Sequence, residues 1–319
     1  MKKYLGIDLG GTNIALGIVD EAGHILARCS VPTGAARPAE EIIASMADAA
    51  KALMREMGIP AEEIASAGVG SPGGVDRESG IVLTACNLPF ANTPLAELLR
   101  IRLGMPVYVD NDANCAAWAE AAAGAAAGTR HSVTITLGTG IGGGIIFQRK
   151  IFRGCTNAGT EPGHIPLIMG GAQCGCGQKG CFEAYASCTA LIRMTKEEIA
   201  AHPESLMWQL CGNDPDRASG RTSFNAAKQG DAVALALVDR YIRYLACGIA
   251  GLINVYRPEI IIVGGGVSNE GDYLMIPLNK YIAEYCYGNG LIVPPKAVKA
   301  TLGNDAGIIG AAMLEKSII

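Results

Sequence analysis

A histidine and three closely spaced cysteines carry the most specific chemical signal in this sequence. Cys174, Cys176 and Cys181 lie within eight residues, and His164 precedes the first of them by ten positions. Three thiolates and one imidazole form a donor set that Zn²⁺ accepts in closed, tetrahedral structural sites. Buried thiols are the alternative, but the glycines and polar residues between these cysteines are not typical of a core segment. We therefore predict a zinc site.

Three glycine-rich segments could bind phosphate groups through their backbone. They are Gly10–Gly11, Gly138–Gly144 and Gly264–Gly266, and each follows an apolar, β-rich run. Backbone N–H groups in such turns form a concavity that binds phosphate oxygens. Simple hairpin turns are the alternative, but three such segments favour a bound nucleotide. Asp8 stands beside the first of them, and a lone carboxylate next to phosphates suits Mg²⁺.

Two common nucleotide motifs are excluded. Gly138-x-Gly140-x-x-Gly143 matches the dinucleotide fingerprint formally, but the strand-like sequence Ile-Ile-Phe147 follows it where that fingerprint requires a helix. The dipeptide Gly-Lys occurs nowhere in the chain, so there is no P-loop.

A group of acidic residues is the third candidate for chemistry. Asp112 lies between a short apolar run and an alanine-rich stretch, where an aspartate is often only a helix N-cap. Asp110 is interpreted as a strand-end residue satisfied by nearby backbone. Glu161 and Glu183 bracket the predicted zinc segment, so an ion there would fix a loop that carries two carboxylates. Such a polar pocket suits a polyhydroxyl ligand through charge-assisted hydrogen bonds.

The elements that must position these residues follow an α/β pattern. Leu5–Val19 and Val133–Phe147 are both predicted to be hairpins with a glycine-rich turn, and they start 128 residues apart. The repeat indicates two related halves, although random glycine enrichment could imitate it, and Thr136 is the counterpart of Asp8. Periodicity and stop signals predict further elements. These are helices over 38–57, from about 113 after an Asp112 cap, and over 231–255; strands over 64–70, 106–109 and 260–263; and a surface loop over 212–221.

Composition limits the class of protein. A length of 319 residues predicts about two domains. The net charge is −4 with no basic block, so nucleic acid is not expected as a partner. No targeting segment or run long and apolar enough to span a membrane is visible, so we expect a cytoplasmic protein without membrane contact. Eleven scattered cysteines fit reduced thiols better than a disulfide scaffold.

Taken together, these segments resemble the ROK (repressor, open reading frame, kinase) family of sugar kinases, within the actin-like ATPase superfamily. The matching motifs cover nearly the whole chain in the family order, and the cysteine element is the most specific. Thr160 and Pro162 depart from the family pattern, which usually has glycine and an aliphatic residue there, and this puts the identity of the sugar in doubt. The motifs are Asp8–Asn13, Val109–Asp112, Leu137–Gly144, Glu161–His164, Cys174–Glu183 and Gly264–Val267.

The resemblance implies an α/β, two-lobed actin-like ATPase (ribonuclease H-like) fold with the active site in the cleft between the lobes. The small lobe would comprise residues 1–112 and the last helix near 304–319, and the large lobe residues 113–303 with the zinc loop. A homodimer or higher homo-oligomer is expected.

The resemblance also assigns roles to residues. Asp112 would be the general base that takes a proton from a sugar hydroxyl, usually on C6, and His164 would face zinc with one ring nitrogen and the sugar with the other. Sugar contacts would come from Asn111, Asp112, Glu161, His164 and Glu183, with Gly73 and Asn87 as further candidates. ATP with Mg²⁺ would contact Asp8, Gly10, Gly11, Thr12, Asn13, Gly138, Thr139, Gly140, Gly264, Gly265 and Gly266.

The expected reaction is ATP-dependent phosphorylation of a hexose, with glucose giving glucose 6-phosphate as the first choice. N-acetylmannosamine, N-acetylglucosamine, allose and fructose remain alternative substrates. A sugar-responsive regulator without catalysis is less well supported, because the first glycine turn follows so closely on Met1 that no helix-turn-helix fits before it. A nucleotide-dependent oxidoreductase would need a helix directly after a glycine turn, which neither hairpin offers.

Overall fold

The structure is a computed structural model that describes residues 2–85, 87–155, 160–288 and 290–317. The chain divides into two compact units. The first comprises Met1–Thr134, Gly144–Thr160 and Thr301–Ile319, and the second Ile135–Gly143 and Glu161–Ala300. Residues 318 and 319, part of the predicted last helix, lie outside the described residues.

A five-stranded sheet forms the centre of the first unit, in the order β3-β2-β1-β4-β8. β1 pairs with β2 in antiparallel register, which confirms the first predicted hairpin, whereas β1–β4 and β4–β8 are parallel. A small antiparallel sheet, β5-β6-β7, follows β4. The bounds are β1 Lys3–Leu9, β2 Asn13–Asp20, β3 Ile25–Pro32, β4 Ile64–Ser71, β5 Gly74–Asp76, β6 Ile81–Thr84, β7 Ala91–Thr93 and β8 Val107–Asn111.

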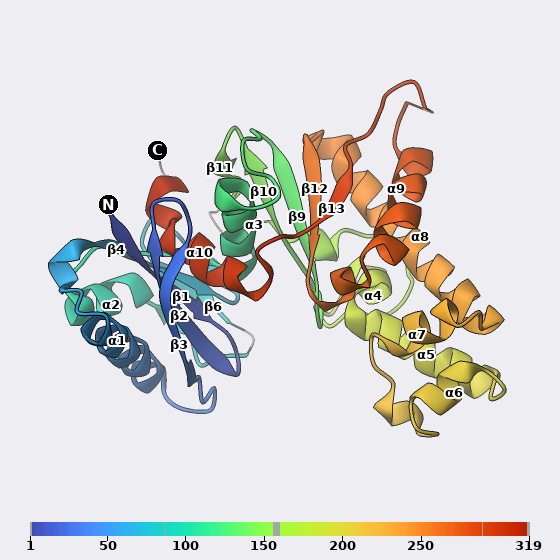
Figure 1. Cartoon of the computed structure of the whole chain (residues 1–319), viewed down its shortest axis with the longest axis horizontal. Coiled ribbons are helices and arrows are strands. Elements are labelled where there is room, and N and C mark those ends of the chain that lie inside the picture. Colours follow the sequence, from blue (N-terminus) through green and yellow to red (C-terminus); the bar gives the residue numbers. More distant parts are fainter. Residues whose placement is uncertain (1, 86, 156–159, 289, 318–319) are drawn as a thin grey trace. The chain divides into compact units, whose positions relative to one another are not determined.

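Helices cover both faces of this sheet, and the alternation of side chains along β1 shows how. Leu5, Ile7 and Leu9 belong to the core formed with α1 (Ala39–Glu56) and α2 (Leu95–Leu103). Successive strand residues point to opposite faces, so Gly6 and Asp8 lie on the other face. That face is covered by α3 (Asp112–Ala123) and α10 (Ala306–Ala312), and Figure 1 shows the C-terminal α10 in red beside the blue N-terminal strands.

Glycines bring α10 unusually close to the sheet and to α3. A Cβ atom on Gly6 would lie 2.0 Å from the Ile308 carbonyl oxygen, and one on Gly68 would lie 1.8 Å from that of Ala311. On the helix itself, a Cβ on Gly310 would come within 1.8 Å of the Cys115 carbonyl oxygen in α3. No side chain fits at these positions, so backbone packs directly on backbone.

The second sheet has the order β11-β10-β9-β12-β13, with antiparallel β10–β11 and parallel β12–β13 pairs. With β9 and β10 as the second hairpin, this order matches that of the first sheet strand for strand. The match supports the predicted duplication over random glycine enrichment. The bounds are β9 Ser132–Leu137, β10 Ile141–Phe147, β11 Lys150–Ile151, β12 Ile260–Gly264 and β13 Ala297–Lys299.

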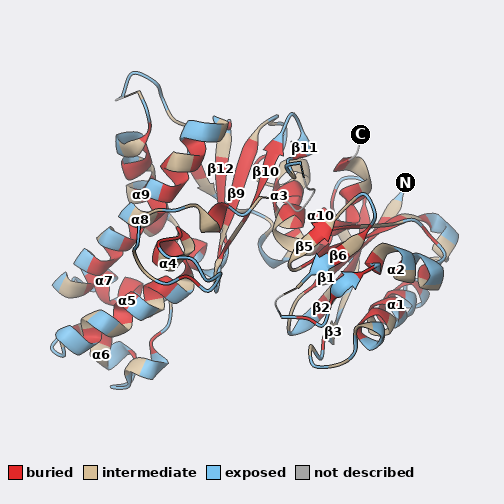
Figure 2. Ribbon diagram, turned by 180° about the vertical axis from the view of Figure 1, so that it is seen from behind, coloured by how far each residue is buried: buried red, intermediate tan, exposed pale blue. Residues whose placement is uncertain are grey.

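Helices α4, α5, α7 and α9 of the second unit pack on the long α8, whose inward face is buried in Figure 2, and α6 packs on α7 and α5. Asp231 caps α8 through a hydrogen bond from Ala234 N, and Arg257 ends it in the left-handed region just before Pro258, close to the end of the predicted helix 231–255. The loop 212–221 contains one 3₁₀ turn, Pro215–Arg217. The bounds are α4 Glu183–Ala186, α5 Cys188–Ala201, α6 Leu206–Leu210, α7 Thr222–Lys228, α8 Ala232–Tyr256 and α9 Asp272–Tyr285.

The predicted helix 38–57 and the strands over 64–70, 106–109 and 260–263 correspond to α1, β4, β8 and β12. The compact units differ from the predicted division at residue 112, since 113–134 and 144–160 belong with the first unit. The close packing of α3 on α10 accounts for the first of these segments, and Ile146 and Ile151 of the second join the same core cluster. Within the described residues, no helix combines the length and the apolar character that a membrane span requires.

Glu120 binds the segment that begins at Thr301, where the chain returns from the second unit to the first. Its carboxylate accepts hydrogen bonds from Ala125 N (2.7 Å), from Thr301 N (2.9 Å) and Oγ1 (3.1 Å), and from Leu302 N (2.9 Å). Glu120 is only 1% exposed, so its carboxylate depends on these donors and has little access to water.

We expect Glu120→Gln to lower the free energy of unfolding by about 2 kcal/mol or more, because the charge is lost and an NH₂ group meets backbone donors. Denaturant unfolding measures this. The matched control is Glu97→Gln, whose exposed pair with Arg100 should contribute little to stability. Equal stability losses in the two variants would contradict the structural role of Glu120.

Candidate active site

The carboxyl ends of the parallel strands β1, β4 and β8 place acidic residues at one edge of the first sheet. Asp8 pairs in register with Gly70, and Gly70 pairs with Asp110. Asp112 is the first residue of α3, directly after β8. On the covered face, Asp8 lies so close to the start of α10 that a Cβ on Gly307 would be 2.4 Å from its Oδ2.

Asn111, and not Asp112, is the N-cap of α3, which corrects the prediction from sequence. The Asn111 Oδ1 accepts from Ala113 N (2.9 Å) and Asn114 N (3.2 Å), and its Nδ2 donates to the Gly73 carbonyl (3.1 Å). Asp112 sits one position later and accepts a hydrogen bond from Ala113 N at 2.8 Å. Asn111 therefore caps the helix, and the Asp112 carboxylate can accept further hydrogen bonds from another group.

Burial alters the acidity of both carboxyl groups at this edge. Desolvation, and then repulsion from Asp112, raise the pKa of Asp8 to about 6. Desolvation also raises the pKa of Asp112, against the opposing effect of hydrogen bonds from backbone N–H groups and Asn111. A carboxylate with a raised pKa is a stronger base once it is ionised. Two adjacent, poorly solvated carboxylates also attract a divalent cation.

The sequence suggested that nearby backbone alone satisfies Asp110. The structure shows that side chains bind it as well. Its Oδ1 accepts from Asn111 N (2.8 Å) and Asn114 Nδ2 (2.9 Å), while its Oδ2 pairs with Arg153 Nε (2.7 Å) and, at 3.7 Å, with Arg77 Nε. The Asp110 side chain is 3% exposed. This ion cluster fixes the end of β8, the strand that leads into Asn111 and Asp112. Nothing in the sequence pattern pointed to the arginines, which lie far from β8 along the chain.

The first glycine turn, Gly10–Asn13, connects β1 and β2. Gly10 N donates to Asn13 O (3.0 Å), and Thr33 braces the turn by donating from Oγ1 to Gly10 O (2.6 Å) and from N to Thr12 O (2.8 Å). The amide of Asn87 lies 2.8 Å from where a Cβ on Gly11 would be. This unit therefore brings together six groups of predicted ligand contacts: Asp8, the turn 10–13, Gly73, Asn87, Asn111 and Asp112.

The other two glycine turns meet in the second unit. Gly265 has φ +82°, and a Cβ there would lie 2.4 Å from the Leu137 carbonyl oxygen at the end of β9. Gly138 and Thr139 are exposed, and a Cβ on Gly138 would meet nothing within 4 Å. Gly138 N donates to Gly140 O at 3.1 Å. The turn thus has an open side at Gly138 that a ligand can approach.

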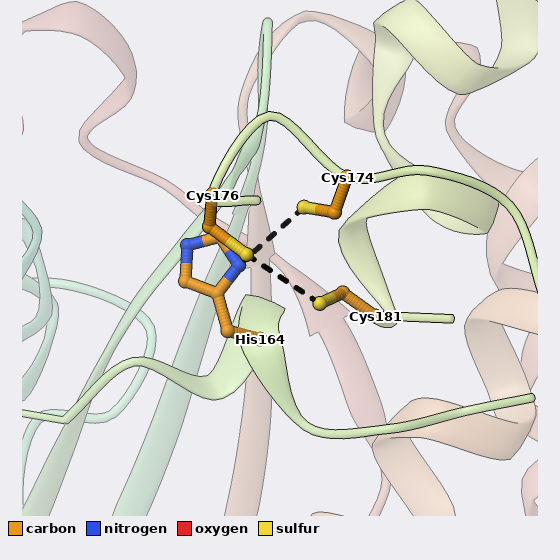
Figure 3. Close-up of side chains that lie close together, drawn as sticks. All are labelled: His164, Cys174, Cys176 and Cys181. Carbon is orange, nitrogen blue, oxygen red and sulfur yellow. Dashed lines mark hydrogen bonds between the residues drawn. The ribbon is translucent and has the colours of Figure 1, made fainter. Parts of the chain in front are cut away.

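The predicted zinc residues converge in the second unit, as Figure 3 shows. One ligand atom from each of His164, Cys174, Cys176 and Cys181 lies within 4.8 Å of all the others. Cys174 Sγ is 3.7 Å from His164 Nδ1, and Cys176 Sγ is 3.7 Å from Cys181 Sγ. We call these four residues the Cys/His cluster.

The dimensions of the Cys/His cluster fit a tetrahedral zinc ion. Zn–S bonds of about 2.3 Å imply sulfur–sulfur separations of about 3.8 Å along a tetrahedral edge, close to the 3.7 Å found here. Phe182, between Cys181 and Glu183, is fully buried against α8, where a Cβ on Gly248 would lie 2.3 Å from its ring. This packing fixes the residues on either side of Phe182.

The two predicted sugar-binding glutamates occupy different environments. Glu183 is partly buried; its Oε1 is 3.3 Å from Cys174 Sγ, and its Oε2 accepts from Ile141 N at 2.9 Å. Glu161 is exposed, and its backbone carbonyl accepts from His164 N in the 3₁₀ turn Pro162–His164. The contact of Glu183 with β10 could not be seen in the sequence, because the two residues are 42 positions apart.

Comparison with known proteins agrees with this architecture. The chain matches the ROK family over residues 4–318. It is 39% identical to a glucokinase of Streptomyces coelicolor, over 99% of this chain and 98% of that protein, and 38% identical to a glucokinase of Thermotoga maritima with the same coverage. A ROK glucokinase from Streptomyces griseus, solved with glucose and AMPPNP, superposes with a TM-score of 0.82 at 38% identity over 98% of each chain.

These similarities confirm the predicted fold class: the molecule has the two-lobed actin-like ATPase fold. Within that class, the chain belongs to the ROK family.

We expect Asp110→Asn to lower the free energy of unfolding by about 3 kcal/mol or more, because it leaves two guanidinium groups that are only 15% and 11% exposed without their anion. The matched control, Asp305→Asn, removes the exposed partner of Arg28 and should change stability by less than about 1 kcal/mol. Chemical denaturation of both variants provides the test. A small effect of Asp110→Asn would show that the ion cluster does not hold β8.

Proposed function

We propose that this protein phosphorylates a hexose with ATP, and that glucose is its substrate and glucose 6-phosphate its product. The observation that carries the proposal is Asp112, a poorly solvated carboxylate at the start of α3 whose capping duty is taken by Asn111. The full-length similarity to glucokinases supports the choice of glucose. N-acetylmannosamine, N-acetylglucosamine, allose and fructose remain alternative substrates.

In the proposed reaction Asp112 accepts the proton of the sugar hydroxyl on C6. The oxygen then forms a bond to the γ-phosphorus of ATP, and the bond from that phosphorus to the β–γ bridging oxygen breaks, releasing ADP. Phosphoryl transfer requires mainly in-line positioning and stabilisation of charge. The protein's own contribution is therefore a fixed base and a set of backbone donors.

The hydroxyl groups of the sugar are assigned to Asn111, Asp112, Glu161, His164 and Glu183, with Gly73 and Asn87 as further contacts. Two of these assignments are constrained by the bonds already described. Asn111 Oδ1 already serves the helix cap, so Asn111 would offer a sugar its remaining amide hydrogen. His164 faces the Cys/His cluster through Nδ1, which leaves Nε2 for a hydroxyl.

The phosphates of ATP are assigned to the turns 10–13, 138–140 and 264–266. Mg²⁺ would be held at Asp8, whose raised pKa shows a carboxylate short of solvation. The ion would supply charge neutralisation at the phosphates.

The Cys/His cluster would hold one structural Zn²⁺. The ion would cross-link the segment carrying His164 to the loop 174–181. Cytoplasmic localisation and a homodimer or higher homo-oligomer are part of the proposal.

A coupled ADP-release assay with a panel of hexoses and N-acetylhexosamines tests the function. ADP release that depends on glucose supports it, and preference for another sugar would reassign the substrate within the same chemistry. No sugar-dependent release from folded, metal-loaded protein would favour a regulator without catalysis.

We expect Asp112→Asn to lower kcat by about 10²-fold or more, because the amide keeps the shape of the side chain but cannot accept the proton. Steady-state kinetics measure the loss, while glucose binding by calorimetry and the thermal unfolding midpoint should stay near the wild-type values. Wild-type turnover in a correctly folded variant would show that another group is the base.

We expect Gly138→Val to raise the Kd for AMPPNP about tenfold or more, equivalent to ~1.4 kcal/mol, with little change in the Kd for glucose. The added side chain would meet no protein atom near its Cβ, so it should obstruct the ligand and leave the fold intact. Gly138→Ala, the smaller matched change, should have a smaller effect. Equal loss of both affinities in calorimetry would instead indicate damage to the fold.

A further inference from the structure

Both chain segments that carry ligands of the Cys/His cluster pack on Ile141, the first residue of β10. Gly163 directly precedes His164, and a Cβ at position 163 would lie 2.2 Å from the Ile141 carbonyl oxygen. Glu183 follows Cys181 by two residues, and its Oε2 accepts the Ile141 N–H at 2.9 Å. The backbone of Ile141 is therefore held on one side by the His164 segment and on the other by the Cys181 segment.

The same carboxylate lies directly against the second glycine turn. A Cβ on Gly140 would be only 2.1 Å from Glu183 Oε2, so no side chain fits between them. At the other end of the turn, Cys188 N donates to Gly138 O at 3.0 Å. The segment 183–188 thus supports the turn at both ends, and the open side at Gly138 stays available to a ligand.

We propose that Glu183 is a positioning residue for the turn Gly138–Gly140, and that the Cys/His cluster sets nucleotide affinity through it. The proposal rests on the proposed function, in which this turn binds the phosphates of ATP. An ion in the cluster cross-links the two segments that hold Ile141. Without that cross-link the turn must be ordered when the nucleotide binds, and this ordering weakens binding. A role for zinc in sugar binding alone would leave the nucleotide site unaffected.

Glu183 can serve the turn and a sugar at once. Its Oε2 faces Ile141, and its Oε1 faces Cys174 Sγ at 3.3 Å. A metal-bound thiolate has no proton to donate, so in the zinc-loaded protein Oε1 is available to a sugar hydroxyl. A change at Oε2 should therefore affect nucleotide binding through the turn, and a change at Oε1 should affect sugar binding.

The first test compares glutamate variants by calorimetry with glucose and with AMPPNP. We expect Glu183→Ala to weaken both ligands, with the Kd for AMPPNP raised about tenfold or more. Glu183→Gln keeps a carbonyl oxygen that can accept from Ile141 N, so it should restore most of the AMPPNP affinity but not the glucose affinity. Glu161→Ala is the matched control on the same zinc segment, and it should weaken glucose alone.

The second test removes the metal and follows the turn itself. Cys176 is exposed and contributes its sulfur to the cluster, so Cys176→Ser should lose zinc with little other change in packing. We expect faster amide hydrogen exchange in peptides covering 138–146, and an AMPPNP Kd raised about tenfold. Chelation of wild-type zinc should reproduce both effects, and added zinc should reverse them.

Three outcomes would overturn the proposal. One is a wild-type protein that contains no metal. Another is loss of zinc that leaves exchange over 138–146 and the AMPPNP Kd unchanged while glucose binding falls. The last is a Kd for AMPPNP that is the same in the Glu183→Ala and Glu161→Ala variants. If the zinc-loaded wild type binds no AMPPNP, the proposed function fails instead, and the exchange measurement still decides whether Glu183 holds the turn.

Discussion

The proposed chemistry of the first unit depends on one carboxylate, at the start of α3, that burial keeps poorly solvated. Asp112 sits at the start of α3 beside a second carboxylate, Asp8, and burial raises the pKa of both. A neighbouring arginine would neutralise Asp112 and weaken it as a base. The arginines of this region are instead paired with Asp110, on the preceding strand. Asn111 performs the helix capping that an aspartate would otherwise do. Asp110 thus pairs with the arginines, Asn111 caps the helix, and Asp112 keeps a carboxylate without an arginine partner.

The C-terminal helix explains why Asp8 is short of solvent. Residues on alternate positions of β1 face opposite sides of the sheet, and Asp8 shares its side with Gly6, on which α10 packs. Only glycines at the contact allow α10 to approach this closely, and Glu120 fixes the segment that leads into it. A helix far from β1 along the chain therefore completes the environment of Asp8.

Much of this arrangement could be predicted from the sequence, because it depends on local patterns. The glycine-turn hairpins, the helix over 38–57 and the spacing of the Cys/His cluster are read from neighbouring residues, and the matching strand orders follow from the repeat. The failures have one cause. The cap at Asn111 and the arginine partners of Asp110 are decided by tertiary contacts. Pattern alone could not choose between Asn111 and Asp112 as the cap, since both residue types favour that position.

The comparison of the two halves also shows why the Cys/His cluster and the second glycine turn should be considered together. In the first half the turn is braced by Thr33, which directly follows β3 of the same sheet, and a carboxylate is supplied by β1 itself. In the second half the strand position equivalent to Asp8 is Thr136, which has no charge. The carboxylate that touches the turn there is Glu183, which comes from the segment after Cys181. The position of Glu183 therefore depends on how firmly the segment that carries it is held. Phe182 packed on α8 anchors it from one side, and a cross-linked Cys/His cluster would anchor it from the other. The geometry therefore links the Cys/His cluster and the second glycine turn through a single glutamate.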